Sequence, residues 1–238
     1  ASDMMKYVDN ARVLGLGETM RFMECCEGEK RMADKLELFA KKHIDGHAPG
    51  IRGKEVQAYR LAGVENDHEC STAEEVLDKL RAGLHIYVRE GSGAKNLETL
   101  IKTMLDAGVC LDRCAFCTDD KHVEEIRKEG HISTCIRKAI ALGVPVAKAY
   151  KMGSYQAAEF YGLKNYGAIG AGYRADIVFL DDLEQVRPLD VMKDGRILTE
   201  EDYAKDYSVP VPDELLHTVH VGEVTKEKIR LSCDGKTD

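Results

Sequence analysis

The sequence predicts an α/β protein built from parallel strands and helices in alternation, and two observations support this fold class. Short apolar runs alternate with amphipathic stretches of helical length along most of the chain. Successive runs also end in histidine or acidic side chains, and the carboxyl ends of parallel strands are where such folds carry their chemistry. About five units in a row fit either a (β/α) barrel or an open doubly wound sheet.

The expected elements follow this alternation in order. Strands are expected within residues 11–18, 43–50, 61–69, 83–92 and 112–120. Helices are expected at about 27–42, 53–62, 72–82, 95–107 and 123–143, where apolar residues recur at helical spacing and "EGH" interrupts the last one. The stretch "STAEEVLDKL" also predicts a helix start, with Ser71 or Thr72 as the cap and Glu74 or Glu75 closing a capping box.

The pattern changes after the fifth unit. Residues 144–163 are expected to be helical, and two β-rich runs follow, "ADIVFL" and "QVRPLDVMKDGRIL". The pair Asp194-Gly195 within the second run is typical of a hairpin turn. We therefore expect one domain over residues 1–171 and a small β element with a tail over residues 172–238.

Composition limits the classes of partner. The chain has 238 residues and a formal net charge of −8, from 34 basic and 42 acidic residues, without a marked basic cluster. This balance argues against a nucleic acid or an anionic membrane as partner. Because no apolar run approaches the roughly 18 residues of a membrane span and no signal peptide is evident, a cytoplasmic protein is expected.

The eight cysteines are expected to be reduced thiols. The run "CAFC" at residues 114–117 has the spacing of a zinc knuckle or a redox pair. However, it lies in a predicted strand, where residues three apart point to opposite faces. We therefore expect that Cys114 and Cys117 share neither a disulfide nor a metal.

Five polar side chains stand at the ends of the five predicted strands: Glu18, His47, His68, Glu90 and Asp119. If the strands form one parallel sheet, these side chains share a rim. Mixed imidazole and carboxylate ligands suit a divalent transition metal such as Mn, Fe or Zn, which activates water while a nearby carboxylate carries the proton. Each residue also has a purely structural alternative, since Glu18 or Asp119 can cap a helix and His68 can be a loop residue.

The sequence resembles a known family over about residues 11–200. The strings that carry the resemblance, in order, are "GLGE", "DGHAPGIRGKEVQAYRLAGVENDHE", "REGSGAKNLETL", "FCTDDKH", "EGHISTCIRKAIALGV" and "GAIGAGYRADIVFLDDL". They resemble the bacterial adenine deaminases of the amidohydrolase superfamily. The resemblance implies a (β/α)8 barrel of the TIM-barrel type with a small β-sandwich. It also implies hydrolysis of adenine to hypoxanthine and ammonia by a hydroxide that two metal ions activate, usually manganese or iron, with zinc as a further option.

The same resemblance implies roles for individual residues. Glu18 would bridge the two metals, and His47 and His68 would be ligands. Asp119 would be both a ligand and the proton shuttle, with Asp120 as the second candidate. Glu69, beside His68, is a further catalytic candidate. The substrate-binding candidates follow the next strand and are Arg89, Glu90 and Ser92.

The sequence also departs from the family. The family opens its barrel with an HxH pair, and none precedes Glu18 here. The chain is therefore expected to hold about the last five βα units of a barrel and to need an amino-terminal segment or association with itself. Two alternatives are a non-catalytic half-barrel that requires a partner segment and a related amidohydrolase that acts on a cyclic amide.

Overall fold

The computed structural model describes residues 1–205 and 208–230. Residues 206–207 and 231–238, which belong to the predicted segment 172–238 and include Cys233, lie outside the described residues. The chain divides into two compact units, Ala1–Leu198 and Thr199–Asp238. The second unit contains two short helices among its described residues, α11 (Glu200–Ala204) and α12 (Asp213–Leu216). None of the described helices has the length and apolar character that a membrane span requires.

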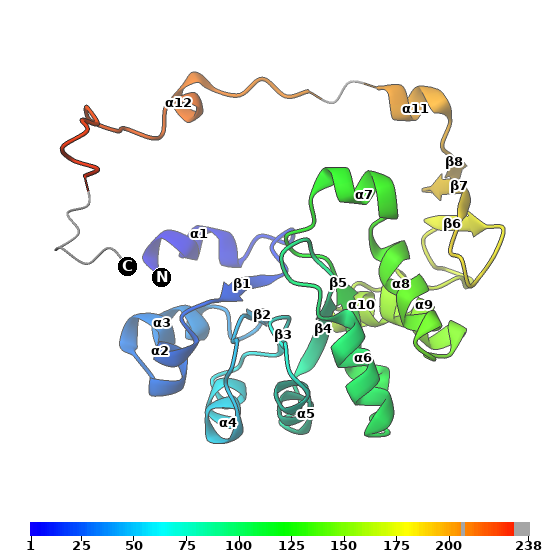
Figure 1. Ribbon diagram of the computed structural model, residues 1–238, viewed down its shortest axis with the longest axis horizontal. Helices are drawn as coiled ribbons and strands as arrows, with labels where there is room; N and C mark the ends of the chain where they lie inside the picture. The colour runs from blue at the N-terminus through cyan, green and yellow to red at the C-terminus, as the bar shows by residue number, and fades with distance from the viewer. Residues whose placement is uncertain (206–207, 231–238) are drawn as a thin grey trace, which may run out of the picture. The chain divides into compact units, whose positions relative to one another are not determined.

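Five short strands alternate with helices in the first unit, as the sequence predicts. The strands are β1 (Gly15–Thr19), β2 (His43–Gly46), β3 (Asn66–Asp67), β4 (His85–Arg89) and β5 (Cys114–Cys117). The helices are η1 (Ser2–Met4), α1 (Met5–Val8), α2 (Phe22–Glu27), α3 (Lys30–Leu38), α4 (Gly53–Leu61), α5 (Ala73–Arg81), α6 (Leu97–Asp106) and η2 (Leu111–Arg113). Figure 1 shows α2 to α6 following one another along one side of the strands.

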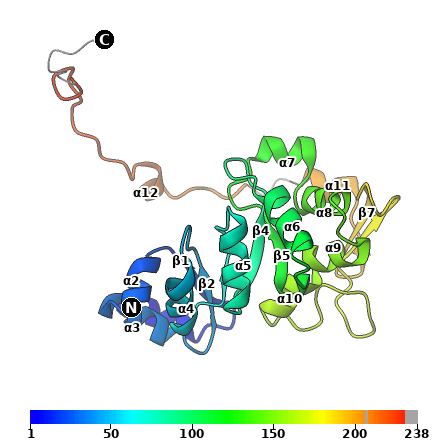
Figure 2. The same ribbon diagram turned by 60° about the horizontal axis from the view of Figure 1, so that its bottom comes forward.

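The strands lie parallel and in sequence order. Strand β1 pairs with β2, and β3, β4 and β5 pair in turn. A bond from the backbone N–H of Glu65 to the carbonyl of Ile44, 3.0 Å long, joins β2 to the segment before β3. Within each of these two groups of paired strands the carboxyl ends therefore lie on the same side. Figure 1 shows the five strands next to one another in the order of the sequence, and Figure 2 likewise shows β1 beside β2 and β4 beside β5. Among the described residues, β1 and β5 each pair with a single strand.

Alternating side chains anchor the strands on both faces. In β4, Ile86 and Val88 are fully buried and pack in one cluster with Leu100 of α6. Tyr87, between them, points the other way and packs with Phe160. Burial of each large apolar side chain contributes about 1.5–3 kcal/mol, which fixes the register of these short strands and thus the place where each one ends.

The predicted start of α5 is confirmed. Thr72 Oγ1 accepts a hydrogen bond from the backbone N–H of Glu75, and the Glu75 carboxylate accepts one from the backbone N–H of Thr72. This capping box satisfies backbone donors that the first helical turn leaves free.

The remaining elements of the first unit are helices and a small antiparallel sheet. They are α7 (Val123–Glu129), α8 (Ile132–Ala141), α9 (Val146–Gly153), α10 (Tyr155–Phe160), β6 (Ile177–Leu180), β7 (Pro188–Lys193) and β8 (Arg196–Ile197). The predicted interruption lies between α7 and α8, where Gly130 has a φ of 99°. The predicted hairpin joins β7 to β8, since Asp194 and Gly195 both take positive φ values, as a type I′ turn requires.

The "CAFC" run forms strand β5, and the strand interpretation is confirmed. Cys114 is buried among the apolar residues that α6 contributes, next to the Met104 sulfur. Cys117 packs on the other side, against the cluster of Tyr87 and Phe160. Both are free thiols, and burial raises the pKa of Cys114 to about 12. Because the two sulfurs point to opposite sides of the strand, they cannot bind one ion.

The stability of the fold should depend on pH through His85. Burial, and then the charge of Arg113, lower the pKa of His85 from 6.5 to about 4. The unfolded chain takes up this proton near pH 6.5, whereas the folded chain does so only near pH 4, so stability falls as the pH drops through this window. Replacing His85 with glutamine is expected to flatten the decline of the urea midpoint between pH 7 and pH 4.5. An unchanged decline in the variant would contradict this assignment.

Candidate metal centre

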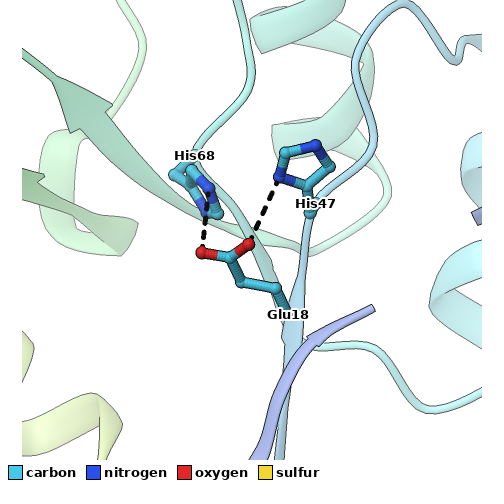
Figure 3. A group of neighbouring side chains, drawn as sticks. All are labelled: Glu18, His47 and His68. Atoms are coloured by element: carbon cyan, nitrogen blue, oxygen red, sulfur yellow. Dashed lines mark ion pairs between the residues drawn. The ribbon is translucent and has the colours of Figure 1, made fainter. Parts of the chain in front are cut away.

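Three potential metal ligands converge at the carboxyl ends of the first three strands. Glu18 lies in β1, His47 directly follows β2, and His68 directly follows β3. Each offers one ligand atom, and these atoms lie within 4.8 Å of one another. In Figure 3 the Glu18 carboxylate lies between the two imidazoles, with one oxygen toward each. Its Oε2 is 3.6 Å from His47 Nδ1, and its Oε1 is 3.7 Å from His68 Nε2.

The spacing of these atoms fits a shared cation. His47 Nδ1 and His68 Nε2 are buried and have no hydrogen-bond partner within the described part of the chain. Their distances to the carboxylate exceed a hydrogen bond. Two ligands that each lie about 2.0–2.2 Å from one tetrahedral ion are roughly 3.3–3.6 Å apart. The donor set of one carboxylate and two imidazoles also suits a divalent transition metal.

A glycine makes the convergence possible. Gly46, the last residue of β2, pairs in register with Thr19 of β1. A Cβ atom on Gly46 would lie 2.0 Å from the carbonyl oxygen of Asn66, at the start of β3. Any larger residue at position 46 would force β2 and β3 apart and would separate His47 from the histidine that follows β3.

A second group of charges borders the three ligands. Glu69 Oε1 lies 3.6 Å from His47 Nδ1 and 3.5 Å from His68 Nε2. The same carboxylate pairs with the guanidinium of Arg89, whose Nη1 also bonds Asp119 Oδ2 at 2.8 Å. Arg89 thus holds two carboxylates side by side, one of them directly beside both imidazoles.

A cavity of about 380 Å³ opens beside the ligands. Glu18, His68 and Asp119 line it, so Asp119 shares this space although it is not one of the three converging ligands. The other lining residues are Asp45, Asn66, Tyr87, Phe116, Cys117, Ala157 and Tyr161. The cavity therefore combines acidic and amide groups near the ligands with two tyrosine rings stacked at an angle of 23°.

Seven of the lining residues were not among the sequence candidates, and three of these seven, Tyr161, Asp45 and Asn66, form a hydrogen-bonded group. Tyr161 donates its hydroxyl to the carboxylate of Asp45, at 3.0 and 3.1 Å, and Asn66 donates to the same carboxylate. Burial, and then Asp45, raise the pKa of Tyr161 to about 12, so its hydroxyl stays protonated. A signal for two of them exists in the sequence, because Asp45 and Asn66 stand two residues before His47 and His68 and strand side chains alternate with period two.

Two of the predicted substrate-binding residues lie in contacts that join loops and helices. Glu90 is 3% exposed and pairs with Lys138 of α8 at 2.5 Å. Ser92 Oγ donates to Glu125 of α7 at 2.8 Å and accepts from the backbone N–H of His122 at 2.9 Å. Neither side chain belongs to the lining of the cavity as the described residues define it.

Asp120, the second candidate for the proton shuttle, also joins two loops. Its carboxylate accepts bonds from the backbone N–H groups of Gly93, at 2.7 Å, and Ser92, at 3.2 Å. The bond from Gly93 contributes most to lowering the pKa of Asp120. Asp119, unlike Asp120, lines the cavity. The backbone of Asp119 has a φ of 48° at this turn.

Parallel strands with interleaved helices and a histidine–carboxylate cluster at the strand ends define an α/β protein of the TIM-barrel type with a candidate metal centre. Solved structures share the fold. A β-aspartyl dipeptidase from Fervidobacterium islandicum AW-1 matches with a TM-score of 0.59 at 18% identity, over 82% of this chain and 62% of that one. An N-acetylglucosamine-6-phosphate deacetylase from Pasteurella multocida matches with a TM-score of 0.53 at 14% identity, over 75% and 59%.

The chain belongs to the amidohydrolase family, whose sequence profile matches residues 27–198. It is also similar to curated adenine deaminases. The identity is 40% to that of Desulfitobacterium hafniense and 41% to that of Clostridium acetobutylicum, each over 98% of this chain. The adenine deaminase of Gluconobacter oxydans is 43% identical over 83% of the chain. The chain spans 40%, 41% and 35% of the lengths of these relatives, respectively.

Proposed function

We propose that this chain is part of a metal-dependent enzyme that hydrolyses adenine to hypoxanthine and ammonia. One observation carries the proposal more than any other. The Glu18 carboxylate lies 3.6–3.7 Å from one buried imidazole nitrogen of His47 and one of His68, and neither nitrogen has a hydrogen-bond partner in the described part of the chain. A cavity with aromatic walls lies beside these ligands. The similarity to adenine deaminases supplies the substrate class.

In this proposal Glu18, His47 and His68 hold one divalent ion. The resemblance favours manganese or iron, and zinc also suits the donor set. When bound, such an ion lowers the pKa of a coordinated water toward neutrality and makes it a nucleophile. A second ion would find Glu18 and Asp119 as ligands from this chain, which is too few for a firm site, so the two-ion centre of the family requires further protein ligands.

We assign transfer of the proton of the attacking water to Asp119 and Glu69, the two carboxylates that pair with Arg89. Asp119 faces the cavity and is proposed to accept the proton of the attacking water and to deliver it to the departing amine. Glu69, between the imidazoles and Arg89, is proposed as the second proton-carrying group. Because Arg89 already bonds both carboxylates, we propose that it positions them and does not contact the purine ring.

The cavity wall supports a flat aromatic substrate. The stacked rings of Tyr87 and Tyr161 offer apolar surface, and Asp45 and Asn66 offer polar groups that could bond a purine edge. Small-ligand sites typically combine apolar walls with a few such groups. Glu90 and Ser92 are proposed to keep the loops after β4 and β5 in place, through their contacts with Lys138 and Glu125.

We further propose that additional strands complete the barrel. The outer edges of β1 and β5 have no strand partner among the described residues, and such edges favour pairing with another segment. The part of the relatives that this chain does not cover is the proposed source, and pairing with a second copy of the chain is the alternative.

The test is ammonia release from adenine by residues 1–238, alone and co-expressed with the uncovered segment of the Clostridium acetobutylicum relative. Deamination is expected only in the presence of the added segment, with cyclic amides hydrolysed poorly. A folded, metal-loaded complex that hydrolyses a cyclic amide and leaves adenine intact would overturn the assignment of substrate. Full activity of residues 1–238 alone would overturn the need for further strands.

A further inference from the structure

Three polar side chains lie completely buried beneath the candidate metal centre. They are Tyr59 of α4, Asp67 of β3 and Lys79 of α5, each with 0% exposure. We call these three residues the buried brace. Helix faces that pack against a sheet are normally apolar, and each buried polar group has a desolvation cost that only its own bonds offset. The hydrogen bonds of these three side chains therefore indicate which parts of the backbone the buried brace holds in place.

Tyr59 joins the strand of Glu18 to the loop of His47. Its hydroxyl accepts a hydrogen bond from the backbone N–H of His47 and donates one to the carbonyl of Thr19, each 3.0 Å long. Thr19 is the residue after Glu18. The Tyr59 hydroxyl thus fixes the backbone of the ligand His47 and the backbone of Thr19, which is next to the ligand Glu18.

Lys79 and Asp67 join the loop of His47 to the loop of His68. Lys79 Nζ donates to the carbonyl of Ala48 at 2.7 Å and to Asp67 Oδ2 at 3.0 Å. The Asp67 carboxylate accepts from the backbone N–H of Ala48 at 2.8 Å and from that of Glu69 at 3.0 Å. Ala48 follows His47, while Asp67 and Glu69 flank His68, so the pair holds both histidine backbones together.

We propose that Tyr59, Asp67 and Lys79 are positioning residues that hold Glu18, His47 and His68 at the spacing one metal ion requires. This inference rests on the proposed metal centre. A buried ion pair is often no more stabilising than apolar residues of the same size, so stability alone does not account for the brace. Groups that orient metal ligands from behind commonly change metal affinity by about 10–100-fold when they are replaced.

The experiment titrates Co²⁺ into residues 1–238 and into Tyr59→Phe, which removes one hydroxyl and keeps the ring. Visible d–d absorption reports the ligand geometry, and competition with a chelator gives the affinity. Tyr59→Phe is expected to bind Co²⁺ at least about tenfold more weakly and with an altered spectrum. Lys79→Met leaves the Asp67 carboxylate buried without its cationic partner, and it is expected to weaken Co²⁺ binding more than Tyr59→Phe does.

Two controls separate positioning from stability. Tyr150→Phe removes another tyrosine hydroxyl bond, the one that Tyr150 donates to the carbonyl of Leu183 at 2.8 Å. Met104→Ala opens a cavity in the fully buried face of α6 and lowers the melting temperature without touching the centre. Both are expected to keep the affinity and the spectrum of the unaltered chain.

The outcomes distinguish the brace from the centre on which it rests. Equal Co²⁺ affinity and an identical spectrum in Tyr59→Phe would overturn the brace and leave the metal centre standing. A loss in Met104→Ala as large as in Tyr59→Phe would also overturn it, because a general loss of stability would then suffice. Absence of Co²⁺ binding in the unaltered chain would overturn the metal centre and the proposed function together.

Discussion

Replacement of His47 or His68 with alanine is expected to abolish stoichiometric binding of a divalent metal by this chain. Each substitution removes one of three converging ligands, and Glu18 with a single imidazole is too sparse a donor set for a firm site. The loss of affinity should exceed about 100-fold, the upper end of what replacement of an outer-sphere partner costs. Metal content per chain after dialysis and Co²⁺ competition measure the effect.

His43→Ala is the matched control, because His43 begins the same strand that ends before His47. Its Nδ1 lies 2.8 Å from Glu65 Oε2, and it does not belong to the cluster of the three described ligands. The His43 variant is expected to keep its metal. Retention of a full metal equivalent in His47→Ala, or equal losses in both variants, would contradict the assignment of ligands.

The second large effect is expected from Asp119→Asn in the complex with the added barrel segment. The amide keeps the size of the side chain but cannot accept the proton of the attacking water. General acid–base groups typically contribute about 10²–10⁴-fold, so kcat for adenine deamination should fall by that factor. Metal bound by Glu18, His47 and His68 should remain, which metal analysis of the same preparation checks.

Asp120→Asn provides the matched comparison at the next residue. Asp120 accepts bonds from the backbone of the loop after β4, so its replacement is expected to lower stability and to leave kcat within a few-fold of the unaltered complex. If Asp120→Asn lost activity as severely as Asp119→Asn, or if Asp119→Asn remained active, the proton-carrying role of Asp119 would be wrong.

The order of the elements was predictable because its signals are local. The apolar runs, the Thr72–Glu75 capping box and the Asp194-Gly195 turn each specify a short stretch without reference to the rest of the chain. The lengths of the individual strands were less predictable. Strand β3 contains only Asn66–Asp67, although residues 61–69 were expected to contain a strand, because pairing with neighbours decides where a strand ends.

The convergence of Glu18, His47 and His68 was predictable for a geometric reason: parallel strands place their carboxyl ends at one edge. Contacts between residues that are far apart in the sequence were not predictable. Tyr161 reaches Asp45 across 116 residues of sequence, and no local pattern indicates that pair. Likewise, the pairing of Arg89 with both Glu69 and Asp119 depends on side-chain directions that the end of β4 and two separate loops set.

Anomalous X-ray diffraction from crystals of the metal-loaded chain shows directly whether Glu18, His47 and His68 bind one metal ion. Data collected at the absorption edges of manganese, iron and zinc locate the ion and identify the element. We expect one peak at roughly 2.0–2.2 Å from His47 Nδ1, His68 Nε2 and a carboxylate oxygen of Glu18. A metal-loaded crystal whose only anomalous peaks lie away from these three side chains would contradict it.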